Sequence, residues 1–238
     1  MYEMINILIQ NVLSSIIGAV SAKMGQLIAL REYGKLKKIL SKYELLYDIA
    51  LFCLYTCMAV LLIPFMKVYT KGVEDADYIL PTIALFFCIK GIVRMFRLPY
   101  SEIVANAGLY KETKIQTINE TWINIVVSII LLPSYGIVGV LIGTIVAEVY
   151  RTIHLYYYIY KNMFSYNIWH TFFRLCYNMA LFIVLYSFSA KLRAYTPVNY
   201  FSLFVTIIGF FVLSCMIFCL LNLLYFFVEK IFDRKIAS

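Results

Sequence analysis

The feature that most constrains the fold of this chain is a succession of apolar stretches of about 18 to 28 residues, separated by short polar segments. As a helix rising about 1.5 Å per residue, each stretch is long enough to cross a hydrocarbon layer of about 30 Å. Hydrophobic residues make up 63% of the chain and charged residues only 14%, whereas soluble domains are about 25% charged. We therefore predict an all-α, polytopic transmembrane bundle of about seven spans.

Hydropathy and helix-breaking residues give approximate span boundaries within a single bundle over residues 1–238. The spans are predicted at roughly 4–22, 46–66, 78–105, 115–133, 137–160, 172–190 and 198–228. Pro81 and Pro99 flank the third span and can kink it, because proline removes a backbone donor. The turn at 133–136 is very short, so the fourth and fifth spans are expected to form an antiparallel hairpin.

The charges between spans predict the orientation. The segment between the first two spans is basic, with Lys23, Arg31, Lys35, Lys37, Lys38 and Lys42 against Glu32 and Glu44. The next segment is acidic at Glu74, Asp75 and Asp77. The positive-inside rule places the first segment in the cytoplasm and the second outside, which puts the N-terminus outside and the C-terminus inside. The tyrosines at 156, 157, 158 and 160 are then expected to form an aromatic belt at the inner interface.

Other chemistries find little support in the sequence. The net charge of +8 does not lie on a soluble basic domain, so nucleic acid is not an expected partner. All six cysteines lie inside apolar stretches, where cysteine behaves as a small apolar residue, and neither a disulfide framework nor a metal site is predicted. The chain contains no glycine-rich phosphate loop and no nucleophile elbow, so we expect no cofactor, no catalytic residue and no enzymatic activity.

Three cations inside the third span call for an explanation. At about 100° per residue, Lys90, Arg94 and Arg97 fall within a sector of about 60° and form one basic stripe. Each costs at least about 2.5 kcal/mol at a helix centre unless it meets water, an anion or a counter-ion. The favoured interpretation is a hydrated cavity, open to the cytoplasm, in which the stripe binds an anionic substrate through guanidinium groups suited to phosphate oxygens.

The alternative is that the stripe is structural. In that interpretation Arg97 reaches the interface, and Lys90 and Arg94 pair with carboxylates. The candidate partners are Asp48, Glu102, Glu120 and Glu148.

Further polar residues lie on neighbouring spans. Glu148 and Arg151 have the i,i+3 spacing of a local ion pair, which is favoured over a gating role. Asn6 and Gln10 share a face, as do Glu120 and Asn124, which indicates either an aqueous interior or interhelical hydrogen bonds. Gly136, Gly139 and Gly143 are interpreted as small residues that allow close helix packing.

Two segments carry a resemblance to a known family. SSIIGAVSAKMGQLIALREYGKLKK looks like a span that ends in small residues and leads into an amphipathic basic loop. In the segment 97–161, a small-residue, glycine and lysine turn precedes an asparagine-containing span, and YGIVG then opens the next span. These patterns resemble the C-terminal half of the O-antigen-type flippases, within the multidrug/oligosaccharidyl-lipid/polysaccharide exporter superfamily.

The resemblance implies a function and a partner. Members of this family move undecaprenyl-pyrophosphate-linked oligosaccharides across the bacterial cytoplasmic membrane for surface polysaccharide biosynthesis, by alternating access between two helical bundles. By position, Lys90, Arg94, Arg97 and Arg151 would inherit the substrate-binding role, with Glu148, Glu120 and Asp48 as gating groups or counter-ions. Because family members have about twice as many spans, an N-terminal partner bundle is expected to be absent from this chain. A multidrug exporter of the same superfamily and a membrane-embedded polymerase or acyltransferase remain alternatives.

Overall fold

The structure, a computed structural model, describes residues 2–71, 78–164, 169–197 and 199–236. Throughout this part of the chain every regular element is a helix, which confirms the predicted all-α bundle. The acidic segment predicted to be external, with Glu74, Asp75 and Asp77, lies outside the described residues.

The helices follow one another with short connections. In order they are α1 (Tyr2–Ala29), α2 (Tyr33–Tyr69), α3 (Pro81–Phe96), α4 (Leu98–Asn106), α5 (Tyr110–Tyr135), α6 (Ile137–Ile159), the π-helical turn η1 (Tyr160–Phe164), α7 (Trp169–Phe188), α8 (Ala190–Ala194) and α9 (Tyr200–Ile236).

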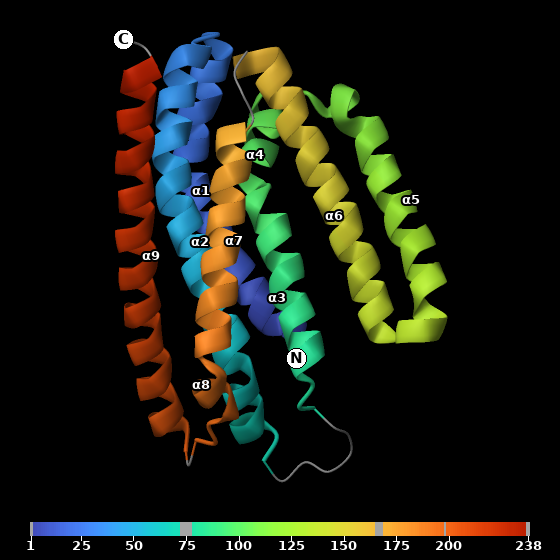
Figure 1. The fold of residues 1–238 in the computed structure, drawn as a ribbon. Helices are drawn as coiled ribbons and strands as arrows, with labels where there is room; N and C mark the ends of the chain where they lie inside the picture. The colour runs from blue at the N-terminus through green and yellow to red at the C-terminus, as the bar shows by residue number, and fades with distance from the viewer. Residues whose placement is uncertain (1, 72–77, 165–168, 198, 237–238) are drawn as a thin grey trace.

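Six of the described helical segments are long and apolar enough to cross a membrane: those beginning at Tyr2, Tyr33, Tyr110, Ile137, Thr171 and Tyr200. A further pass is made by α3 and α4 together, which continue in one direction after a break at Arg97 (Figure 1). The described chain therefore passes along the bundle seven times, and the protein is a multi-pass membrane protein. The predicted third span over 78–105 corresponds to these two helices.

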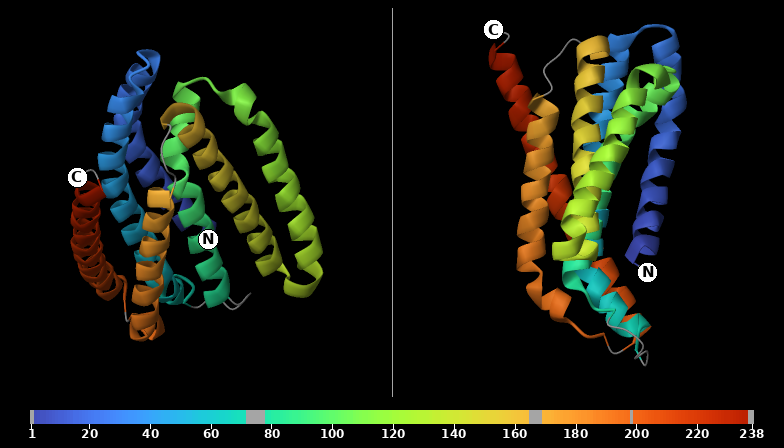
Figure 2. Two further views of the ribbon diagram at one scale, coloured as in Figure 1. Left: turned by 45° about the horizontal axis from the view of Figure 1, so that its top comes forward. Right: turned by 90° about the vertical axis from the view of Figure 1, so that its right-hand side faces the viewer.

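The helices pack around α2 (Figures 1 and 2). Within its most apolar window 83% of the residues are buried, and it contacts α1, α3, α7, α8 and α9. The α5–α6 hairpin leans away from the other helices in Figure 1 and in the left view of Figure 2, and α6 joins it to the rest through α3. In the corresponding window of α5 no residue is buried. Most of the outer surface of this hairpin is therefore available to lipid or to another chain.

The basic segment after the first span is a helix rather than a loop. Only residues 30–32 separate α1 from α2, and Arg31 takes a positive φ of 57° at this turn. The lysines from 35 to 42 lie on the first turns of α2, which has 37 residues and so extends about 55 Å. The high charge density of this segment suggested a loop, but lysine is a good helix former and charged residues are compatible with a helix that extends beyond the membrane.

The third pass is broken at the predicted proline. Pro99 has no N–H to donate to the Met95 carbonyl, and the hydroxyl of Tyr47 on α2 donates to that oxygen at 2.9 Å. The Tyr100 N–H turns to the Arg97 carbonyl at 3.1 Å, and the hydroxyl of Tyr156 on α6 donates to the Phe96 carbonyl at 2.9 Å. Two tyrosines from other helices thus replace the backbone bonds lost at the kink.

This arrangement corrects the expected aromatic belt. Tyr156 is only 5% exposed and its ring stacks on Phe96, with ring centroids 5.4 Å apart. Tyr160 donates to or accepts from Tyr100 at 3.0 Å and Thr171 at 2.7 Å. Tyr157, at 54% exposed, is the clearly exposed member of the run. Hydropathy placed the tyrosines at a helix end but could not show which side of α6 faces the core.

The α5–α6 hairpin is confirmed, and its glycines have two different roles. A Cβ at Gly143 would collide with the Ser128 side chain, and one at Gly139 would lie 2.6 Å from the Leu131 carbonyl oxygen. These two residues therefore allow α5 and α6 to approach closely, as predicted. Gly136 meets nothing within 4 Å and instead takes a φ of 56° at the turn, a conformation that favours glycine.

Candidate functional site

Four of the predicted site residues meet in one cluster at the kink. The two terminal nitrogens of Arg97 contact Glu120 on α5 at 3.0 Å and Glu148 on α6 at 2.8 Å. The side chains of Arg97, Glu120 and Glu148 are 15%, 20% and 9% exposed. One guanidinium thus connects the α3–α4 junction with both helices of the hairpin.

Arg151 completes this cluster. Its Nε lies 3.7 Å from Glu120, and its Nη1 donates to the Thr113 carbonyl at 3.0 Å. The predicted local pair between Glu148 and Arg151 is therefore replaced by two pairs between helices. The sequence spacing allowed the local pair, but the kink places Arg97 closer to Glu148. With two guanidinium groups and two carboxylates, the cluster is formally neutral.

Lys90 is neutralised separately. Its ammonium lies 2.8 Å from a carboxylate oxygen of Glu3 in the first turn of α1 and 4.7 Å from the centre of the Phe87 ring. Glu3 was not among the expected partners. Glu3 lies just before the predicted first span of 4–22, so it was not considered as a partner for a cation inside the membrane.

Arg94 differs from the two cations that flank it. Its side chain is exposed, and among the described residues no carboxylate lies within ion-pair distance of its guanidinium. The predicted basic stripe is thus divided: Lys90 and Arg97 each have counter-ions, and Arg94 stands between them without a carboxylate partner in the described part of the chain. Glu102, another expected partner, accepts a hydrogen bond from Ser21 on α1 at 2.9 Å.

Asp48 lies away from the stripe. Its carboxylate is 2.6 Å from Arg174 on α7, and the same guanidinium contacts Glu44 at 2.9 Å. The structure therefore does not bring Asp48 to Lys90 or Arg94. Arg174 was not among the predicted site residues, although it is a cation inside the predicted sixth span, as Lys90 is inside the third.

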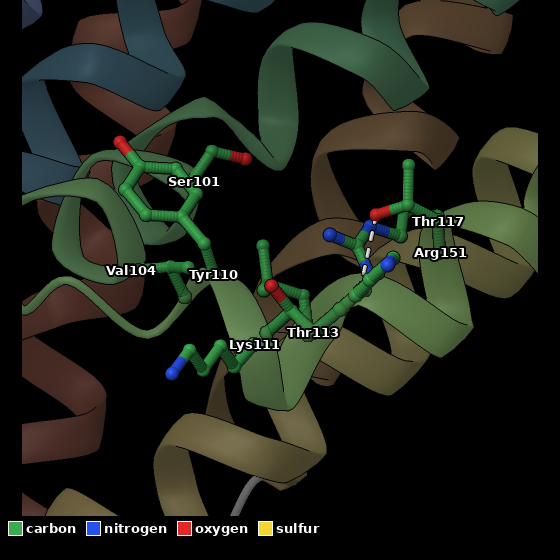
Figure 3. A pocket seen from close by; sticks show the side chains of 9 residues that line it. Ser101, Val104, Tyr110, Lys111, Thr113, Thr117 and Arg151 are labelled. Atoms are coloured by element: carbon green, nitrogen blue, oxygen red, sulfur yellow. Dashed lines mark hydrogen bonds between the residues drawn. The ribbon is translucent and has the colours of Figure 1, made fainter.

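A cavity of about 480 Å³ adjoins the Arg97 cluster where α4, α5 and α6 meet (Figure 3). Its polar lining comprises Ser101, Lys111, Thr113, Lys114, Thr117 and Arg151. In Figure 3, Lys111 extends away from Thr113 on the side opposite Arg151. The cationic groups of this lining can receive an anion, whereas its serine and threonine hydroxyls already donate to backbone carbonyls one turn earlier.

The amides of the bundle make hydrogen bonds between helices. Asn6 accepts from Tyr55 at 2.8 Å, and Asn119 donates to Tyr150 at 3.2 Å. The Asn124 side-chain oxygen accepts from Thr144 on α6 at 3.4 Å. For these asparagines the structure favours interhelical packing over an aqueous interior.

The cysteines contribute to the α2–α9 contact. The sulfur atoms of Cys53 and Cys215 are 3.2 Å apart, and the Cys57 sulfur is 3.4 Å from the Ser214 hydroxyl oxygen. All six cysteines are free.

Comparison of the chain with protein-family models, with curated proteins and with solved structures finds no match in any of the three.

Proposed function

We propose that this chain is one helical bundle of a transporter that moves a lipid-linked, anionic oligosaccharide across the bacterial cytoplasmic membrane, without chemical conversion of the substrate. The observation that carries the proposal is the state of Arg94, which is exposed within a membrane-embedded helix and has no described carboxylate partner. An unpaired cation in an apolar environment is costly, and an anionic ligand offsets that cost.

The chemistry of the guanidinium supports a phosphate-bearing ligand. Arg94 can offer two parallel N–H donors to phosphate oxygens, which a lysine cannot do. Arg97 is already held by two carboxylates, so an anion would have to compete with them. We therefore assign Arg94 to binding, and Arg97 and Arg151 to positioning the hairpin beside the bound headgroup.

The proposed orientation of the bundle in the membrane follows from the charge distribution. The turn after α1, the turn before α5 and the end of α9 lie at the same end of the bundle (Figure 1). This end carries Arg31, the lysines of early α2, and Lys111 and Lys114 beside the cavity. By the positive-inside rule we propose that this end is cytoplasmic, which would place the cavity near the lipid phosphates of the inner leaflet.

Binding of a polyprenyl pyrophosphate to the purified chain in nanodiscs tests this proposal. Arg94→Ala is expected to weaken the affinity about tenfold, the effect of losing roughly 1.4 kcal/mol of charge-assisted hydrogen bonding. Arg94→Lys is expected to give an intermediate loss, because it keeps the charge but not the paired donors.

Lys38→Ala is the matched control, since Lys38 is an exposed cation on α2 away from the stripe. Equal affinity of Arg94→Ala and the wild type would contradict the proposal. Tighter binding of cationic dyes than of the pyrophosphate would instead favour a multidrug exporter.

A further inference from the structure

A second buried ion cluster lies between α2 and α7 and is not used by the proposed anion site. Glu44 and Asp48 stand one turn apart on α2, and Arg174 reaches both from α7. The side chains are 7%, 3% and 12% exposed. The three residues, which we call the α2–α7 triad, are thus enclosed by protein.

The formal charges of the triad do not balance. Two carboxylates share one guanidinium, through the Glu44 Oε2 contact at 2.9 Å and the Asp48 Oδ2 contact at 2.6 Å. Arg174 is the one cation among the described side chains within ion-pair distance of either carboxylate. With all three groups ionised, the cluster carries one uncompensated negative charge.

The titratable side chains that the structure describes around the triad do not supply the missing positive charge. They are Tyr47 on α2, Tyr100 on α4, Tyr156 on α6 and Tyr160 on η1, which interact electrostatically with its carboxylates. Phenols are neutral at physiological pH. No hydrogen bond of normal geometry reaches the buried Glu44 Oε1, although the Tyr100 hydroxyl lies close enough to interact with Glu44.

A buried, uncompensated charge is expensive, and two carboxylates that share a site relieve the repulsion by taking up a proton. We propose that the α2–α7 triad is a proton-binding site, which at neutral pH holds one proton shared by Glu44 and Asp48. The proton comes from water and adds to a carboxylate oxygen, with Glu44 Oε1 as the acceptor. The protonated triad is then neutral overall.

Proton occupancy changes how strongly α7 is held to α2. Without the proton, Arg174 faces two charged carboxylates, whereas with it the guanidinium faces only one. Release of the proton therefore strengthens the attraction between the two helices. The site does not depend on Arg94, so it stands or fails separately from the anion-binding proposal.

Infrared spectroscopy of the chain in lipid bilayers tests the proposal, because the C=O stretch of a protonated carboxyl group is distinct from carboxylate bands. The wild type is expected to show a protonated-carboxyl band at pH 7 that disappears at alkaline pH. Glu44→Gln and Asp48→Asn are each expected to abolish this band, since the single remaining carboxylate is balanced by Arg174. Glu112→Gln, which changes an exposed carboxylate on α5, is the matched control and leaves the band unchanged.

Two results overturn the proposal. The first is a wild-type spectrum without a protonated carboxyl group at pH 7. The second is a band that persists in a folded Glu44→Gln or Asp48→Asn variant, which would place the proton elsewhere. If only one of the two variants folds, it is enough to assign the band to the triad. Both substitutions remove a charge without changing the shape of the side chain.

Discussion

Arg97 and Glu148 form an ion pair at 2.8 Å between the kink of the third pass and the middle of α6. Both side chains are largely buried, and the i,i+3 spacing in the sequence predicted Arg151 rather than Arg97 as the partner of Glu148. The pair holds the α5–α6 hairpin to the rest of the bundle at the level of the kink.

Removing one member of this pair is expected to destabilise the bundle strongly. Arg97→Ala leaves two carboxylates near each other without their shared cation and should lower the free energy of unfolding by about 3 kcal/mol. Glu148→Ala should cost more than Glu120→Ala, because Glu148 is the more buried carboxylate. Reversible denaturation in mixed micelles provides the measurement, and near-additive losses in the Arg97→Ala, Glu148→Ala double variant would argue against direct coupling.

The hydrogen bond from Tyr47 to the Met95 carbonyl is expected to matter only while residue 99 is proline. Tyr47→Phe should cost about 1 kcal/mol, because a buried carbonyl loses its donor. In a Pro99→Ala background the alanine N–H can serve Met95, so the same substitution should cost much less. Tyr157→Phe is the control, since Tyr157 is exposed. An equal cost of Tyr47→Phe in both backgrounds would contradict this account of the kink.

Gly91 is expected to tolerate no side chain. A Cβ there would collide with the Tyr55 ring and hydroxyl and lie 2.5 Å from the Asn6 amide oxygen. Gly91→Ala should therefore destabilise the bundle by about 1 to 3 kcal/mol, as overpacked cores do. Gly18→Ala on α1 meets open space and is expected to be neutral or stabilising. Thermal unfolding in detergent compares the two, and similar midpoints would refute the close approach.

Gly143 should show the same sensitivity for the hairpin. Gly143→Leu would drive α6 away from Ser128 on α5 and is expected to open the hairpin while the other helices stay packed. Gly209→Leu on α9 is the matched control, because nothing lies within 4 Å of a Cβ at that position. Distances between spin labels on α5 and α6 report the separation. An unchanged distance distribution in Gly143→Leu would show that the glycine is not needed for packing.

Local features of the fold could be predicted from the sequence, whereas the partners of each charge could not. The lengths of the apolar stretches predicted the passes through the membrane, Pro99 predicted the kink in the third pass, and the short turn at 133–136 predicted the α5–α6 hairpin. Helical periodicity predicted one face for Lys90, Arg94 and Arg97, but it does not say which helix lies opposite each of them. The pairs Lys90–Glu3 and Asp48–Arg174 join residues 87 and more than a hundred positions apart, and only tertiary packing determines them.

The kink also has a consequence for the order in which the protein can be completed during synthesis. The Met95 carbonyl finds its partner on α2, which is made earlier, but the Phe96 carbonyl depends on Tyr156, 60 residues further along the chain. At about 5 to 20 residues per second, α3 and α4 emerge about 3 to 12 seconds before that hydroxyl exists. The bond from Tyr156 to the Phe96 carbonyl can therefore form only after α6 has been inserted beside the third pass.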